Sequence, residues 1–224
     1  MDVFIDTFLN GEVLAQYAPS ILQGALVTVL LSVLIVIFGV AFGAARACLR
    51  AYRVRALAAL IMIFADVFRA LPPLVLILLI FFGLPNVGVV LSAPIVLFLV
   101  LSLVLGAFAE EIVWAGITAT PKGQWEAARS TGLSHTQALI WVVLPQAIRM
   151  VIPPLTNRAI AITKMTALGM VIGVPDILGQ ATTAQSFSAN ASPLTLAAIA
   201  YVILFLPFVM ASRWLEARFA RPML

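Results

Sequence analysis

Charged side chains are scarce in this sequence. Asp, Glu, Lys and Arg together make up only 10% of the residues, against about 25% in soluble domains. Apolar residues reach 63% and include long uncharged stretches, such as the one from Ile21 to Ala45. A helix needs roughly 20 such residues to cross a lipid bilayer. The scarcity of charge therefore excludes an ordinary soluble domain and predicts an integral membrane protein.

Cysteine, histidine and the common catalytic motifs are also nearly or wholly missing. Cys48 and His135 are the only residues of their kinds, which excludes a disulfide within the chain and a Cys-x-x-Cys metal site. There is no Gly-x-x-x-x-Gly-Lys-Ser/Thr loop to hold ATP, and neither Gly-x-Ser-x-Gly nor His-Glu-x-x-His occurs. Basic residues form no stripe with interleaved aromatic residues, as nucleic-acid binding would require. We expect no enzyme activity, no metal and no nucleic acid.

The apolar runs predict an all-α protein with five transmembrane helices in a single domain over residues 1–224. Their expected positions are about 21–45, 57–82, 87–115, 147–169 and 194–212. A polar segment at about 120–145 separates the third span from the fourth. The segment 171–192 is too polar in its second half to face lipid, so we expect a short half-helix and an external loop there.

Basic residues are distributed unevenly between the connecting segments, and this predicts the orientation of the chain. They lie in the segment after the first span, in the polar segment and in the C-terminal tail. The residues before the first span, the turn after the second and the segment before the fifth contain none. Because cytoplasmic loops are enriched in Lys and Arg, we expect an external N-terminus, a cytoplasmic C-terminus and a cytoplasmic polar segment.

The polar segment has the signals of two short helices. Thr120 is the expected N-cap of the first, with Pro121 at its first position, and Gly132 suits the left-handed residue that ends it. Ser134 and Gln137 predict a capping box at the start of the second helix, and Pro145 is expected to bend or break the chain before the fourth span.

The surface of this segment suits contact with another protein. Ala127 and Ala128 have small side chains that allow close approach to the backbone, and Glu126 can pair with a basic partner. The alternative is an amphipathic helix that rests on lipid headgroups. The segment has only Lys122 and Arg129 as basic residues and Trp125 as its large apolar contact, which argues against that alternative.

Taken together, the run Glu126–Leu133 and the following Leu144–Ala147 resemble the cytoplasmic coupling loop of membrane subunits of ABC importers, in the version of the polar-amino-acid uptake family (histidine, glutamine, glutamate and arginine type). The similarity extends over nearly the whole chain. It includes Phe68–Pro72, Ala109–Val113, Pro153–Asn157 and Lys164–Leu168.

The resemblance implies a fold, a function and partners. The fold is that of type I ABC importer permeases, with a cytoplasmic coupling helix. The function is to form, with a second permease subunit of the same or a homologous chain, the pathway for a polar amino acid delivered by an external solute-binding protein. A cytoplasmic ATPase dimer binds ATP and Mg, so this chain needs no cofactor. The protein is expected to be a multi-pass protein of the bacterial cytoplasmic (inner) membrane.

The same resemblance implies which residues couple the permease to the ATPase. They are Gln124, Glu126, Ala127, Ala128, Gly132 and Leu133. Two departures from the family pattern leave the substrate open: Trp114 stands where the family usually has Arg, and Met165 and Ala167 stand where it has Asp and Ser. A permease for an opine, a quaternary amine or methionine is the alternative. A channel or secondary carrier should show an inverted internal repeat, which the sequence lacks, and a scaffold would give the intramembrane charges no role.

Ionisable residues fall within the expected spans, and in lipid each must pair or face water. Among them are Asp66, Arg69, Glu110, Glu111, Arg158 and Lys164. The spacing predicts a local pair between Asp66 and Arg69, and one of the two glutamates is expected to bind a basic group of the fourth span. Candidates for the substrate pathway are Arg69, Glu111, Asn157, Lys164 and Thr166. The alternative is that these groups only hold helices together.

Overall fold

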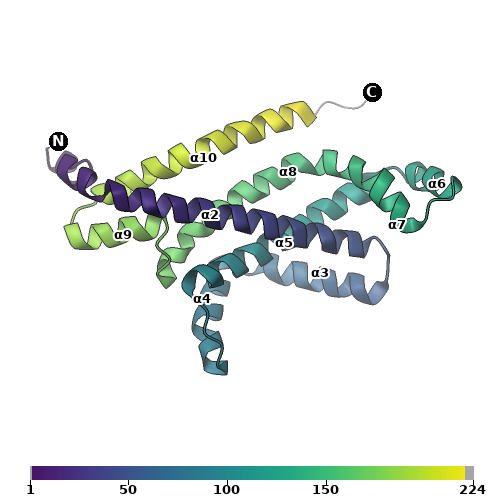
Figure 1. The fold of residues 1–224 in the computed structure, drawn as a ribbon, viewed down its shortest axis with the longest axis horizontal. Coiled ribbons are helices and arrows are strands. Elements are labelled where there is room, and N and C mark those ends of the chain that lie inside the picture. Colours follow the sequence, from purple (N-terminus) through teal and green to yellow (C-terminus); the bar gives the residue numbers. More distant parts are fainter. Residues whose placement is uncertain (1, 220–224) are drawn as a thin grey trace. The chain divides into compact units, whose positions relative to one another are not determined.

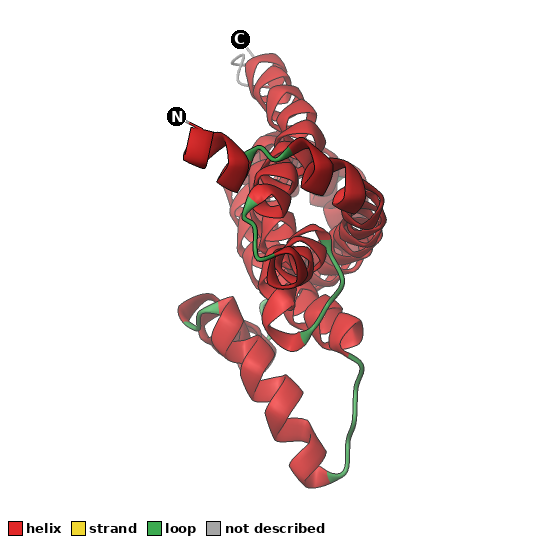
Figure 2. Ribbon diagram, turned by 90° about the vertical axis from the view of Figure 1, so that its left-hand side faces the viewer, coloured by secondary structure: helices red, strands yellow, loops and turns green. Residues whose placement is uncertain are grey.

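The computed structural model describes residues 2–219, all of whose regular elements are helices (Figures 1 and 2). In chain order they are α1 (Asp2–Phe8), α2 (Gly11–Arg50), α3 (Arg55–Ala70), α4 (Pro73–Gly83), the 3-10 helix η1 (Leu84–Val87), α5 (Ala93–Ala119), α6 (Lys122–Ser130), α7 (His135–Ala138), the π turn η2 (Leu139–Val143), α8 (Leu144–Lys164), the 3-10 helix η3 (Met165–Ile172), α9 (Ile177–Ser188) and α10 (Ser192–Phe219). The all-α fold expected from the sequence is confirmed.

The breaks between helices follow from local chemistry. Asn10 begins α2, because its side-chain oxygen accepts hydrogen bonds from the backbone N–H groups of Glu12 at 3.1 Å and Val13 at 3.2 Å. Helix α3 ends before Leu71, which is extended with φ −86° and ψ 134°. Leu71 precedes Pro72, and a residue before proline is kept out of the helical region by the proline ring.

Several helices are long and apolar enough to cross a membrane. By length and composition, the described residues contain four such segments, at Asp2–Arg50, Ala93–Ala119, His135–Ser188 and Ser192–Phe219. A fifth is added if the helices on either side of the break at residues 71–72 count as one span. The structure thus agrees with a multi-pass membrane protein, while the expected number of five spans stays a prediction.

The chain forms two compact units, which we describe separately. Unit 1 consists of Met1–Ile35, Pro73–Leu101 and Ile162–Met210, and unit 2 of Val36–Pro72, Ser102–Ala161 and Ala211–Leu224. In unit 1, α9 packs against the first part of α2 and against α10 through Ile21, Ile177 and Ala197. The segment 171–192, where a short half-helix and an external loop were expected, therefore contains a packed helix. Its first residue is held in place because the Ile177 N–H donates to the Thr28 hydroxyl at 3.3 Å.

In unit 2, the second part of α2 lies directly against α5. A Cβ atom added to Gly43 would come within 2.5 Å of the Ala109 Cβ, and one added to Gly39 would come within 2.9 Å of Leu105. The small residues thus let the two helices approach closely. The core of unit 2 continues from these helices to η2 and α8, through Ala47, Ala51, Val113, Ile117, Leu139, Val143, Ala147 and Val151.

Candidate functional site

The polar segment folds as two short helices, α6 and α7, which lie next to each other before α8 (Figure 1). Helix α6 begins at Lys122, and Pro121 occupies the N-cap position without a side-chain cap. The predicted capping role of Thr120 is wrong, because its hydroxyl donates to the Gly116 carbonyl at 3.2 Å and completes the end of α5 instead. Thr120 is buried, and Lys122 is exposed.

Gly132 ends α6 in the left-handed conformation, with φ +88°. Two backbone hydrogen bonds close the turn: the Gly132 N–H donates to the Arg129 carbonyl at 3.1 Å, and the Leu133 N–H donates to the Ala128 carbonyl at 3.3 Å. This pair of bonds is the Schellman arrangement, which satisfies carbonyls that the helix end leaves free. The predicted role of Gly132 in ending the helix is confirmed.

The start of α7 is also as predicted. The Gln137 N–H donates to the Ser134 hydroxyl at 3.2 Å, and the Ser134 N–H donates to the Gln137 side-chain oxygen at 2.8 Å. These reciprocal bonds form the capping box. With both ends fixed by local bonds, the turn 131–134 between α6 and α7 has a defined geometry.

Contacts to the ends of α2 and α8 attach this loop to unit 2. The His135 ring stacks on Trp125, with centroids 5.0 Å apart, and its Nε2 lies 3.1 Å from the Ala51 carbonyl oxygen. The Gln146 amide nitrogen of α8 donates to Gln124 at 3.2 Å. His135 was not among the predicted coupling residues. Its position one residue after the capping serine, as the sole histidine, is the only sequence signal for this tether.

The predicted coupling residues occupy different faces of α6. Ala128 is buried at 6% exposure, so it packs against the rest of unit 2. Glu126, Ala127 and Gly132 are exposed. Of the two adjacent alanines, therefore, Ala127 is the one available to another protein.

Between α7 and α8 the chain passes through one π turn, η2, in which the Leu144 N–H donates to the Leu139 carbonyl. Pro145 follows in the first turn of α8. Proline has no N–H to donate to the carbonyl four residues before it. The residue with that carbonyl, Trp141, lies within the wider π turn Leu139–Val143. The helix continues where a break was one of the expected outcomes.

Each of the adjacent glutamates of α5 has an arginine partner in unit 2. Glu110, which is 1% exposed, accepts from Arg50 of α2 at 3.1 Å. Glu111 forms an ion pair with Arg69 of α3. The expectation that one of them binds a basic group of the fourth span is wrong within the described residues. The predicted pair between Asp66 and Arg69 is present at 3.9 Å, but it is the longer of the two contacts of Arg69.

The remaining pathway candidates lie in separate surroundings. Asn157 of α8 bonds to α10, since its amide nitrogen donates to Glu216 and its oxygen accepts from the Ser212 hydroxyl at 2.6 Å. Beside it, Arg158 lies 3.9 Å from the centre of the Phe108 ring, whose centre is 5.5 Å from Arg69. The structure thus brings Arg69 and Glu111 into contact in unit 2 and engages Asn157 elsewhere in the same unit.

Lys164 and Thr166 belong to unit 1. Lys164 is exposed at one wall of a cavity of about 450 Å³, with its ammonium 5.8 Å from the centre of the Phe205 ring. Thr166 is fully buried, and its hydroxyl donates to the Thr163 carbonyl at 2.9 Å. Lys164 therefore lies on the surface of the chain, whereas Thr166 is buried and already has a partner.

Comparison with known proteins identifies the chain's family. The family of binding-protein-dependent transport system inner membrane components matches residues 36–221. The chain belongs to this family. The probable glutamine ABC transporter permease protein GlnP of Bacillus subtilis (strain 168) is 37% identical over 76% of this chain and 80% of its own length. The arginine ABC transporter permease protein ArtQ of Haemophilus influenzae is 33% identical over 71% and 76%.

Solved structures agree with this assignment. The crystal structure of an amino acid ABC transporter with histidines superimposes with a TM-score of 0.83 at 32% identity, over 92% of this chain and 96% of that one. The MetNI methionine ABC transporter in an inward-facing conformation reaches 0.72 at 20% identity, over 90% and 96%, and shows a shared fold. The expected type I ABC importer permease fold is therefore confirmed for this multi-pass membrane protein.

Trp114, one of the two departures from the family pattern, contacts the Arg50 side chain in this permease. Trp114 stands where the family usually has Arg, and the Arg50 guanidinium lies 4.6 Å from the centre of its ring. Arg50 also pairs with Glu110 at 3.1 Å. Arg50 thus supplies the positive charge beside Glu110, and Trp114 supplies an aromatic face for that charge.

Proposed function

We propose that this chain is the membrane subunit of an ATP-driven importer for a polar amino acid. The proposal rests on the loop from Pro121 to Ala138. Local hydrogen bonds fix its turn, side-chain contacts hold it to the rest of unit 2, and it exposes Ala127 and Glu126. Such a rigid, small-residue surface suits contact with a cytoplasmic ATPase. The same loop in a chain related to glutamine and arginine permeases favours an amino-acid substrate.

The rest of the transporter is supplied by other chains in this proposal. This sequence has no phosphate-binding loop. In the proposal, therefore, the ATPase dimer binds ATP and Mg and hydrolyses ATP. A second permease subunit completes the pathway with a two-fold or pseudo-two-fold arrangement, and an external solute-binding protein delivers the amino acid. The chain lies in the bacterial cytoplasmic membrane with its N-terminus outside.

Exposed charges in the membrane-spanning helices support a polar solute. Glu111 is about half exposed (49%) and its partner Arg69 is 32% exposed, and Lys164 is exposed in the other unit. A zwitterionic amino acid needs an anionic partner for its ammonium group and a cationic one for its carboxylate. We assign these roles to Glu111 and Arg69. Asn157 acts by holding α8 to α10, and Thr166 bonds locally to the Thr163 carbonyl.

Reconstitution tests the function directly. The permease is assembled with the ATPase and the solute-binding protein encoded beside it, and uptake of labelled amino acids into vesicles is measured with and without ATP. We expect ATP-dependent uptake of a polar amino acid, and we expect competition by other polar amino acids but not by choline. Uptake of choline or methionine in preference to every polar amino acid would contradict the proposed substrate class.

A further inference from the structure

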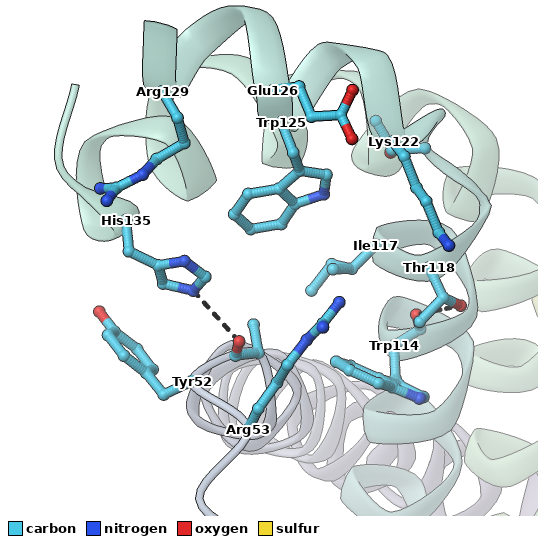
Figure 3. A pocket seen from close by; sticks show the side chains of 12 residues that line it. Tyr52, Arg53, Trp114, Ile117, Thr118, Lys122, Trp125, Glu126, Arg129 and His135 are labelled. Atoms are coloured by element: carbon cyan, nitrogen blue, oxygen red, sulfur yellow. Dashed lines mark hydrogen bonds between the residues drawn. The ribbon is translucent and has the colours of Figure 1, made fainter. Parts of the chain in front are cut away.

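A cavity of about 840 Å³ in unit 2 borders the loop 121–138, and the function proposed above assigns it no ligand (Figure 3). It lies between the ends of α2 and α5 and the helices α6 and α7. Three of its lining side chains are basic and one is acidic; these are Arg53, Lys122, Arg129 and Glu126. The excess of positive charge makes an anion the natural ligand.

Two of the basic groups are available to such a ligand. Arg129 already donates to the Leu133 carbonyl at 3.0 Å. Among residues 2–219, by contrast, the observed ion pairs involve neither Arg53 nor Lys122. Figure 3 shows the Arg53 side chain extending into the cavity from one side and the Lys122 side chain reaching in from another. The two cations thus enter one space from different helical segments.

The backbone at Arg53 supports a binding role. Arg53 has φ +57°, and it is one of two non-glycine residues with positive φ in the described part of the chain. L-residues other than Asn and Asp rarely adopt this conformation, and it persists where the surrounding structure or a function demands it. The tight turn after α2 directs the Arg53 side chain toward α6. Glycine or asparagine would adopt the same backbone conformation more easily but would place no positive charge there.

The position of the cavity along the helices identifies the ligand further. Helices α2 and α5 are apolar spans that end there, at Arg50 and Ala119. The aromatic residues Tyr52, Trp114 and Trp125 line the same cavity, and Trp and Tyr are enriched where a membrane meets water. Lipid phosphates lie where spanning helices leave the bilayer, and basic pockets between spanning helices bind anionic headgroups.

We infer that the cavity binds a phosphate group, with Arg53 and Lys122 as its ligands. Arginine binds phosphate through two parallel N–H bonds and lysine through one compact charge. A bound phosphate would connect the end of α2 to α6 and would thereby hold the loop 121–138 in place. An anionic phospholipid and a free phosphate ion present the same group, and the aromatic lining at the ends of two apolar spans favours the phospholipid.

Lipid binding by the full-length permease is the test. The protein is extracted from vesicles of phosphatidylcholine mixed with phosphatidylglycerol, and the lipids retained are counted by native mass spectrometry. Arg53→Gln and Lys122→Gln should each weaken retention of phosphatidylglycerol about fivefold, which corresponds to about 1 kcal/mol per cation. Arg53→Lys should retain part of the binding. Arg55→Gln is the matched control, because Arg55 is exposed in the same segment and does not line the cavity.

A second arm separates the two sources of phosphate. Inorganic phosphate is titrated into the permease in neutral detergent, and tryptophan fluorescence reports binding beside Trp114 and Trp125. Phosphatidylglycerol retention that depends on Arg53 supports the lipid. A saturable fluorescence change that depends on Arg53, without lipid selectivity, supports the free ion. Equal lipid retention by Arg53→Gln, Lys122→Gln and Arg55→Gln, with no response to phosphate, would overturn the inference. All three side chains are exposed, so folding should persist, and gel filtration checks it.

Discussion

The turn at Gly132 offers the sharpest test of the coupling loop, because the chain contains a matched control. A Cβ atom added to Gly132 or to Gly123 would meet nothing within 4 Å. The two glycines differ in backbone conformation, since Gly132 has φ +88° and Gly123 lies inside α6. Valine at either position adds the same volume and hydrophobicity, but only valine at position 132 must adopt the left-handed conformation.

The expected magnitude follows from that conformation. A residue with a Cβ atom costs roughly 1–2 kcal/mol in the left-handed region, and a β-branched residue is a clear outlier there. Relief of this strain requires loss of the two hydrogen bonds that close the turn, from the Gly132 and Leu133 N–H groups. The native angle between α6 and α7 should therefore be populated roughly 5–30-fold less in Gly132→Val. At Gly123, valine replaces a poor helix former and should be neutral or slightly favourable.

Proteoliposomes with the permease, its ATPase and the solute-binding protein provide the assay, and the measured quantity is the number of solute molecules taken up per ATP hydrolysed. We expect this ratio to fall in Gly132→Val and to stay normal in Gly123→Val, with equal amounts of both proteins inserted. Gly132→Asn should lie between them, because asparagine tolerates the left-handed conformation. A wild-type ratio in Gly132→Val would refute the assignment of residues 121–138 as the coupling loop.

Two further predictions concern the ion pair and the orientation. Exchanging the charges of Arg69 and Glu111 should restore assembly relative to either single change, with a coupling of about 0.5–3 kcal/mol, while uptake stays lost. Normal uptake by the double variant would remove both residues from the pathway. The control is Asp66→Asn, at a side chain that is 76% exposed. In a Cys48→Ala background, single cysteines at Asn10, Asn86 and Ala189 should react with impermeant thiol reagents in intact cells, because these positions are expected outside. A cysteine at Gly123 should not react, and external labelling there would contradict the proposed orientation.

Local features of the loop could be predicted from the sequence, because they depend on neighbouring residues. The capping box at Ser134 and the left-handed Gly132 involve partners within five residues along the chain, and their chemistry is the same in any fold. Thr120 shows the limit of this approach. Its hydroxyl was free to cap the following helix or to complete the preceding one, and it bonds back to Gly116. Such competition is decided by the direction in which the chain turns.

The partners of the intramembrane charges could not be predicted, because they depend on how the helices are rotated against each other. Adjacent residues point about 100° apart on a helix, so Glu110 and Glu111 necessarily face different neighbours. Which neighbours those are follows from packing: the small residues Gly39 and Gly43 bring α2 against α5, and this contact places Arg50 beside Glu110. The role of Asn157 depends in the same way on α10, which follows it by more than thirty residues.

The coupling loop and the ion pair between Arg50 and Glu110 both contact the C-terminal end of α2. Arg50 pairs with Glu110 at 3.1 Å, and one residue later the Ala51 carbonyl oxygen lies 3.1 Å from His135 of α7. Ala51 also belongs to the core that includes Ile117 near the end of α5 and Leu139 of η2. A force on the loop is therefore carried to the end of α2 by a hydrogen bond and by close packing, and interiors packed this tightly yield little. Displacement of α6 by an ATPase should move the ends of α2 and α5 together rather than bend the loop, since local hydrogen bonds fix the turn between α6 and α7.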